Sequence, residues 1–425
     1  MIPLVLLIIV FAVYWPSLKG HFVSDDFVVI SNPNLQAGSY GMGTYTDRHL
    51  SWWSLVRDFK RHDVEALKRQ APPYWFHITN VLIHFACCLV VLGILHTIPG
   101  ANPLAAFLFA VHPLCTGSVA YITGRFSLLS TLFGLISILG VLHGWPLLFL
   151  LGWWLACLSK PDMYTLPILA AILGGWYYLL AYALLGVPYL RHWLRTRKIE
   201  MAAIAGMPVK NFDSGQLRFG SDICLPRLEY FLTYICETIK WFPQWMFGLR
   251  LRIMPDVQKR AMWKLLMALF CMFLLLGFLL VLPMGLLKVG LALLLMSPWI
   301  FYSLIPLPHV IFEYRTYMNI SGMIILLSIL PTPALLLLGM LWFPLTYLRS
   351  RYWNNTMALW GTAFNEGSRS AYVLLHLGAA FLMYGRIADA ETFIIEGLRK
   401  QPGNRVGQND LLRITQLKLK LLGEK

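Results

Sequence analysis

The sequence is poor in charged residues and poorest in acidic ones. Of its 425 residues, 13% are charged and only 20 are Asp or Glu, whereas 58% are hydrophobic. A water-soluble globule of this length could not hide so much apolar surface from solvent. The composition therefore excludes a soluble protein and predicts an all-α polytopic membrane protein, because helices satisfy their own backbone groups in lipid.

Two further absences narrow the class. The first apolar run, 2–18, lacks the basic start and small-residue cleavage site of a removable signal, so we expect a retained first helix. Five of the seven cysteines lie in or beside apolar runs, which argues against a disulfide framework. The net charge of +15 favours anionic partners, which for a bilayer protein are membrane lipids or phosphorylated lipids and not nucleic acid.

Apolar runs extend through residues 1–348, which we interpret as one transmembrane domain. The runs 163–190 and 320–348 are long enough for two short limbs each, around Gly174–Gly175 and Pro331–Pro333. With the other runs they predict about 9–11 spans.

Two long polar connections, 20–74 and 191–261, interrupt this domain. The first contains "LSWWSLVRDFKRH" and the second "LPRLEYFLTYICETIKWFPQWMFGLRL", both aromatic and amphipathic. Such segments are typical of helices that lie in the membrane interface. The second connection is also basic, with 12 Lys or Arg against 6 Asp or Glu.

The tail, 349–425, has the composition of a soluble segment. A tetratricopeptide unit placed at 371–404 puts Leu377, Gly378, Ala390 and other small or apolar residues near the packing positions of that repeat. One such unit cannot bury its apolar face alone, so we expect it to pack on flanking helices or on the membrane domain.

Five polar groups beside apolar runs are candidates for function, because polar residues at membrane depth are costly. They are Asp25 with Asp26; "HPLCTGSVAYITGR" with His112, Tyr121 and Arg125; "LSKPD" with Lys160 and Asp162; "HVIFEYRTY" with His309, Glu313, Arg315 and Tyr317; and His77 with His84. The carboxylates could deprotonate an acceptor or hold Mg²⁺ or Mn²⁺, and the cations could grip a phosphate leaving group.

Each group also has a structural interpretation. The carboxylates could be solvated at a helix exit, and a lysine at the interface could simply snorkel. The remaining alternatives are a helix end for His112, a lock between Arg125 and a carboxylate, a local ion pair for Glu313 with Arg315, and packing or hydrogen bonding for His77 and His84.

The order of the motifs resembles a known family. A first helix is followed by the paired acids and "NPN", then "HP" and "GR", then "LSK", then "EYRTY", then a tetratricopeptide unit. Over residues 1–404 this order is similar to the transmembrane and tetratricopeptide-repeat O-mannosyltransferases and their bacterial relatives. Those proteins belong to the GT-C class, which uses polyprenyl-phosphate sugars.

The resemblance implies roles for individual residues. It implies that Asp25 or Asp26 is catalytic and that Arg125, Lys160 and Arg315 surround the donor phosphate. We expect the remaining polar residues of these motifs to contact substrate, namely His112, Tyr121, His309, Glu313 and Tyr317. The chain departs from eukaryotic members in its single repeat and in Pro161, where an acidic residue commonly follows the lysine.

The resulting expectation is an inverting glycosyltransferase of a bacterial inner membrane with its active site facing the periplasm. The expected acceptor is a Ser or Thr of a secreted protein such as a pilin, or alternatively a lipid-linked glycan. A lipid or sugar transporter and a non-enzymatic scaffold are the rival classes.

A single active site requires Asp25, His112, Lys160 and Arg315 on one side of the membrane. Counting the membrane crossings from a cytoplasmic N-terminus places Asp25, His112 and Lys160 on the external side. Arg315 joins them only if the run 163–190 crosses the membrane twice, as a hairpin. We therefore expect the connection 191–261 to be external despite its basic charge, because the positive-inside rule applies to loops of up to about 60 residues.

Overall fold

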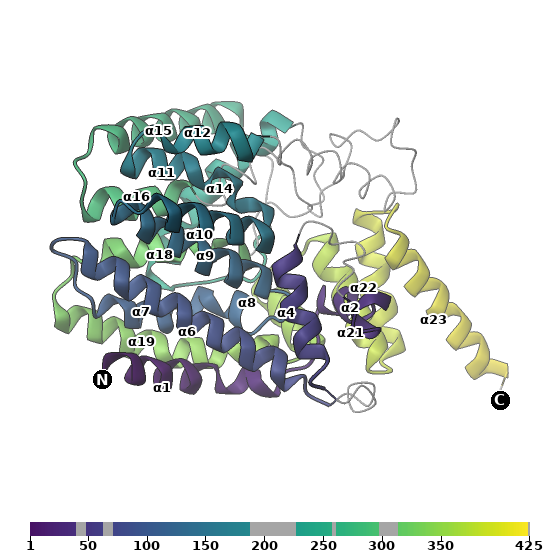
Figure 1. The fold of residues 1–425 in the computed structure, drawn as a ribbon. Helices are drawn as coiled ribbons and strands as arrows, with labels where there is room; N and C mark the ends of the chain where they lie inside the picture. The colour runs from purple at the N-terminus through teal and green to yellow at the C-terminus, as the bar shows by residue number, and fades with distance from the viewer. Residues whose placement is uncertain (40–47, 63–70, 188–226, 257–260, 297–312, 424–425) are drawn as a thin grey trace.

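The computed structural model describes residues 1–39, 48–62, 71–187, 227–256, 261–296 and 313–423. Every regular element in these ranges is helical, and no strand occurs in them. Figure 1 shows a bundle of helices that run side by side, with further helices beyond one of its ends. The all-α fold class predicted from composition is therefore confirmed.

The bundle is formed by long and short helices. In chain order they are α1 (Ile2–Tyr14), η1 (Trp15–Lys19), α6 (Tyr74–Thr97), α7 (Ala105–Ala110), η2 (Pro113–Cys115), α8 (Thr116–Val119), α9 (Arg125–Leu142), α10 (Pro146–Ser159), η3 (Pro161–Thr165), α11 (Leu166–Gly174), α12 (Tyr178–Ala181), η4 (Tyr182–Gly186), α15 (Met262–Val281), α16 (Leu286–Met296), η7 (Glu313–Thr316), α18 (Tyr317–Leu327) and α19 (Thr332–Ser350).

The connections and the tail contain the other helices. The first connection holds α2 (Asp26–Ile30), α3 (Pro33–Gln36) and α4 (His49–Phe59), and the second holds α14 (Arg227–Phe247). The tail holds η8 (Arg351–Trp353), α20 (Thr356–Asn365), α21 (Ala371–Met383), α22 (Ile387–Lys400) and α23 (Arg405–Gly423).

Four helical segments in the described ranges are long and apolar enough to cross a membrane. They are Ile2–Lys19, Tyr74–Thr97, Arg125–Leu142 and Met262–Val281. α10, η3 with α11, and α18 are apolar but shorter. Helices of this length and composition are stable only where lipid or protein covers them, so the chain is a multi-pass membrane protein.

Glycines allow the central helices α9 and α10 to approach closely. A Cβ added at Gly140 would lie 2.8 Å from the backbone nitrogen of Phe149, and one added at Gly152 would lie 2.8 Å from that of Ser137. The two helices therefore touch through backbone atoms, as small residues permit between membrane helices. This contact fixes the start of α9 beside the end of α10.

Both long apolar runs fold back on themselves. α11 ends at Gly174, the next residue, Gly175, has a φ of 126°, and η4 then returns to contact η3. A positive φ favours glycine, so the "GG" pair permits the turn. α18 and α19 are likewise joined by a short turn at 328–331, and both pack against α7. A turn therefore occurs at each predicted position within 163–190 and 320–348, and the double crossing of each run stays a prediction.

The two ends of the bundle differ. At one end the turns meet directly, with Asn102 N–H donating to Ser328 O at 3.0 Å and Thr97 Oγ1 lying 3.2 Å from His143 Nε2. The opposite end carries α2, α4 and the tail helices (Figure 1). We call this opposite end the site end.

α4 and α14 form the helices predicted from their amphipathic sequences. α4 buries Trp52, Leu55 and Phe59 in one apolar cluster with Phe76 and Phe126, while Trp53 remains exposed. Its apolar face therefore packs on protein, and the exposed Trp53 is the part that suits an interface.

The tail packs on the rest of the protein. α21 and α22 form the predicted hairpin, where a Cβ on Gly378 would lie 2.6 Å from Ile394 Cγ1. Trp353 and Trp360 join one apolar cluster with Val23 of the first connection. The tail thus completes its core against the site end, as expected for a single unit that cannot bury its face alone.

Candidate active site

The two adjacent carboxylates of the first connection lie in different environments. Asp26 is buried, and it accepts hydrogen bonds from Val23 N–H at 3.1 Å and Thr123 N–H at 2.8 Å. Burial raises the pKa of Asp26 to about 7, although these amide bonds act in the opposite direction. Asp26 therefore ties the first connection to the turn that precedes Arg125.

Asp25, in contrast, is exposed. Its backbone N–H donates to the Tyr121 hydroxyl at 3.1 Å, and the Tyr121 ring lies 5.0 Å from the Trp353 ring of the tail. The charge of Asp25 also reaches His376 on α21, where burial lowers the imidazole pKa and Asp25 partly raises it. The carboxylate is thus accessible at a position fixed by its own backbone, and the tail forms part of its surroundings.

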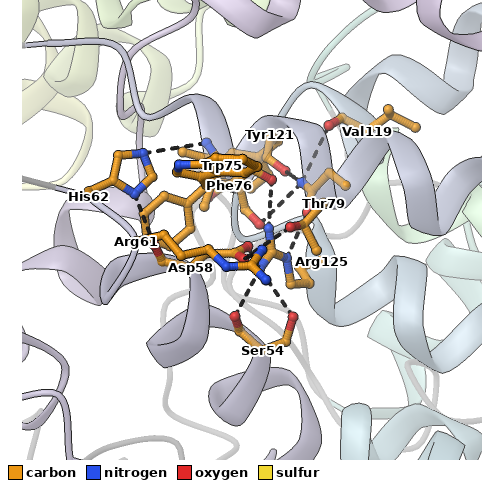
Figure 2. Close-up of polar contacts among 12 residues, drawn as sticks. Ser54, Asp58, Arg61, His62, Trp75, Phe76, Thr79, Val119, Tyr121 and Arg125 are labelled. Atoms are coloured by element: carbon orange, nitrogen blue, oxygen red, sulfur yellow. Dashed lines mark hydrogen bonds and ion pairs between the residues drawn. The ribbon is translucent and has the colours of Figure 1, made fainter.

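Arg125 is fully buried at the start of α9 (Figure 2). Its guanidinium forms an ion pair with Asp58 and also donates to Asn80 Oδ1 at 2.8 Å and to Phe76 O at 2.6 Å. Further bonds reach the hydroxyl and carbonyl of Ser54. A buried arginine is tolerated when its donors are satisfied in this way.

The sequence around Arg125 explains its position. A Cβ on Gly124 would lie 2.3 Å from Ser118 O, so only glycine allows the chain to turn so tightly before α9. Asn80 links Arg125 to the preceding turn, because its Oδ1 accepts from Arg125 and its Nδ2 donates to Tyr121 O at 2.8 Å. This geometry corresponds to the Arg–carboxylate lock considered above, with Asp58 as the partner that sequence reasoning did not identify.

Lys160 lies at the end of α10 and forms a second charged cluster. Its Nζ lies 2.9 Å from Asp162 Oδ2 and donates to Ser127 Oγ at 3.0 Å. The charges of Arg48 and Arg315 both act on it. We call Arg48, Lys160 and Arg315 the cation cluster; sequence reasoning found the last two, whereas Arg48 was not predicted.

Other predicted substrate contacts occupy packed positions. His112 is buried, and its Nδ1 accepts from Leu114 N–H at 3.2 Å, which caps η2. Tyr317 is buried, with its hydroxyl 2.5 Å from His84 Nδ1. His77 Nε2 lies 3.2 Å from Gly20 O. These contacts match the structural interpretations of the histidines, and the substrate role of Tyr317 stays a prediction.

The last predicted site features are His309, Glu313 and a divalent metal at the paired aspartates. His309 lies outside the described residues, and Glu313 begins η7. Within the described ranges, no group of three or more His, Cys, Asp or Glu side chains could hold a metal ion. The predicted metal at Asp25 and Asp26 thus has no third ligand of these types there, and Asp26 already accepts two amide bonds.

Comparisons with known proteins support the resemblance seen in the motifs. The chain is 32% identical over 148 residues to human protein O-mannosyl-transferase TMTC1, covering 30% of this chain and 16% of that protein. It is 37% identical over 153 residues to mouse protein O-mannosyl-transferase TMTC4, covering 29% and 20% respectively. Mouse protein O-mannosyl-transferase TMTC3 is 30% identical over 146 residues, covering 31% and 16%.

The matched region is a limited part of each relative, since the chain spans a fifth or less of their length. No family model matches the chain, and no solved structure matches it. The predicted resemblance to these transferases is confirmed, whereas the bacterial relatives stay a prediction.

Proposed function

We propose that this membrane protein is a glycosyltransferase that moves a sugar from a polyprenyl-phosphate donor to a Ser or Thr hydroxyl of a protein. The observation that carries the proposal is the cation cluster at the same end of the bundle as the exposed carboxylate of Asp25. The similarity to protein O-mannosyl-transferases supports a protein acceptor.

The proposed reaction is a single in-line displacement. Asp25 accepts the proton of the acceptor hydroxyl, whose oxygen forms a bond to the anomeric carbon. The bond from that carbon to the phosphate oxygen breaks, and its electron pair leaves with the lipid phosphate. One displacement inverts the anomeric configuration.

The charged groups divide this work. Lys160 and Arg315 of the cation cluster stabilise the charge that develops on the departing phosphate. Arg125 is enclosed by Asp58, Asn80 and backbone oxygens, so its part is to hold α4 and α9 in place around that site.

The surroundings of the reaction follow from the same proposal. We place the site end on the periplasmic side of a bacterial inner membrane, where secreted proteins such as pilins would be acceptors. We expect a lipid-linked donor to approach the cation cluster laterally from the bilayer.

The test is mass spectrometry of secreted and surface proteins from cells without the gene, complemented with variants. The wild-type chain should restore a sugar on Ser or Thr, while Asp25→Asn should reduce it at least about 100-fold because the base is lost. Asp389→Asn, in an exposed ion pair with Arg386 on the tail, is the matched control and should behave as wild type.

Equal modification by wild type and Asp25→Asn, at equal protein levels in the membrane, would exclude Asp25 as the base. If the wild-type chain changes no protein glycan at all, the protein acceptor itself is wrong.

A further inference from the structure

The loop that carries Asp25, residues 21–26, contains a strained backbone position. Ser24 has a φ of 50°, in the left-handed region that residues with a side chain rarely adopt. Such a conformation costs free energy and persists only where the surrounding structure holds it. We call residues 21–26 the aspartate loop. The contacts on either side of Ser24 therefore decide where Asp25 lies.

The bundle holds the second half of the aspartate loop. Asp26 accepts two amide bonds, and the Asp25 N–H donates to the Tyr121 hydroxyl at 3.1 Å. The Tyr121 ring is buried, so it cannot move without repacking its neighbours. The position of the Asp25 backbone is thus coupled to the position of that ring.

The tail holds the first half of the aspartate loop. Asn354 O accepts the N–H of His21 at 2.8 Å, and Val23 is buried in the same apolar cluster as Trp353. Trp353 also packs on Tyr121, with the ring centres 5.0 Å apart and the ring planes at 33°. Trp353 therefore shares a core with the first half of the loop and contacts the ring that fixes the second half.

The tail is itself attached to the second connection. Ser368 Oγ and Arg369 N–H donate to the Asp256 carboxylate, at 2.6 Å and 2.7 Å respectively. Ile253 N–H donates to Glu366 Oε2 at 2.8 Å. The tail is thus bonded to both connections, so it forms a fixed support for the aspartate loop.

Resting on the proposed function, we propose that Trp353 is a positioning residue for sugar transfer, which holds the general base Asp25 in place through the Tyr121 ring. Trp353 is 1% exposed, so it acts through Tyr121 and not by contact with substrate. A strained loop released from this support relaxes into other conformations, in which Asp25 no longer meets the acceptor hydroxyl. A displacement of about 1 Å can lower the rate of a reaction about 100-fold.

The first measurement reports the position of the loop and needs no substrate. A nitroxide spin label is attached to Asp25→Cys in a full-length chain without native cysteines, and electron paramagnetic resonance in detergent gives its mobility. Tyr121→Phe removes only the hydroxyl, and Trp353→Leu removes the ring that packs on Tyr121. Both should shift the spectrum toward the mobile component. Trp353→Phe keeps a smaller ring and should give an intermediate shift.

The second measurement is transfer in cells without the gene, complemented with the same variants carrying native Asp25. Mass spectrometry of secreted and surface proteins should show about 10- to 100-fold less sugar on Ser or Thr with Trp353→Leu than with wild type, at equal protein levels in the membrane, because the base is displaced. Tyr121→Phe should also lower the modification, and Trp353→Phe should retain more of it than Trp353→Leu.

Phe393→Leu is the matched control. It removes another ring of the tail, which packs on Phe381 at 5.3 Å and on Phe364 at 5.2 Å, and it leaves the contact between Trp353 and Tyr121 in place. Both its label mobility and its transfer should match wild type.

An unchanged spectrum in Tyr121→Phe and Trp353→Leu, or an equal change in Phe393→Leu, would overturn the inference. If wild type transfers no sugar, the proposed function is wrong, and the role of Trp353 in transfer falls with it even where the label becomes mobile. Should Trp353→Leu fail to fold, Trp353→Phe decides by the same criterion.

Discussion

At the scale of single residues, two neighbouring aspartates lie in different environments. Asp26 is buried against backbone amides from two segments, whereas the Asp25 side chain is exposed beside Tyr121. The general base of the proposed reaction must reach its substrate, so the exposure of Asp25 supports assigning that role to it. The buried Asp26 stabilises the loop that carries Asp25, through its bonds from Val23 and Thr123.

The protonation of Asp26 makes stability depend on pH. The pKa of Asp26 in the folded protein, about 7, lies above the ordinary aspartate value of 3.8, so the folded protein binds an extra proton between these values. The contribution of Asp26 to stability is then fully present below about pH 4 and is lost as the pH rises through about 7. The difference corresponds to at most about 4 kcal/mol.

Asp26→Asn should remove this dependence. In thermal unfolding in detergent, the variant should gain stability relative to wild type between pH 5 and pH 8, because wild type loses its proton over that interval. If the variant instead loses relative stability as pH rises, the amide bonds from Val23 and Thr123 outweigh burial and depress the pKa.

At the scale of elements, the position of α4 depends on a buried ion pair. Asp58 of α4 contacts Arg125 of α9, and Thr79 of α6 donates to the same carboxylate at 3.0 Å. Together with the bond from Ser51 to Ser159, these contacts join α4 to three bundle helices. α4 is therefore held against the end of α10, next to Lys160 in the chain.

Asp58→Asn should destabilise the protein by about 3–5 kcal/mol, because it leaves a buried guanidinium without its counter-charge. Arg61→Gln is the control, since Arg61 is 42% exposed and lies 3.7 Å from the same carboxylate, and it should cost less than about 1 kcal/mol. Thermal unfolding in detergent measures both. Equal effects of the two variants would mean that the Arg125 pair does not hold α4.

At the scale of the whole molecule, chain reversals bring distant charged residues to one end. α11 with η4, and α18 with α19, return the chain to the site end each time. The tail then covers part of that end, with His21 N–H donating to Asn354 O at 2.8 Å. The first connection, the cation cluster and the tail consequently share one side of the bundle.

Combined with the proposed periplasmic position of the site end, this arrangement predicts which positions a membrane-impermeant thiol reagent reaches from outside the cell. In a chain without native cysteines, Ser31→Cys, Thr392→Cys and a cysteine at Lys210 should be labelled before the inner membrane is opened. His143→Cys, at the opposite end, should be labelled only afterwards. Labelling of Lys210 from the inside alone would contradict an external connection 191–261.

The sequence by itself determined the class of the protein and where its long apolar runs turn. Low charge and long apolar runs require lipid-covered helices, and Gly174–Gly175 and Pro331–Pro333 mark where those runs turn back. The order of polar motifs was enough to predict the resemblance to O-mannosyltransferases. It also placed Asp25 and Lys160 among the candidates, since few polar residues occur beside apolar runs.

Only the tertiary structure decided how these residues divide their roles. A buried arginine predicts a partner, but Asp58 lies 67 positions away and becomes that partner only when α4 packs on α9. The sequence does not distinguish Asp25 from Asp26, because the Asp26 carboxylate accepts from Thr123 in a distant turn as well as from nearby Val23. Burial and proximity depend on how helices pack, so the attachment of α4 to the end of α10 could be recognised only in the folded chain.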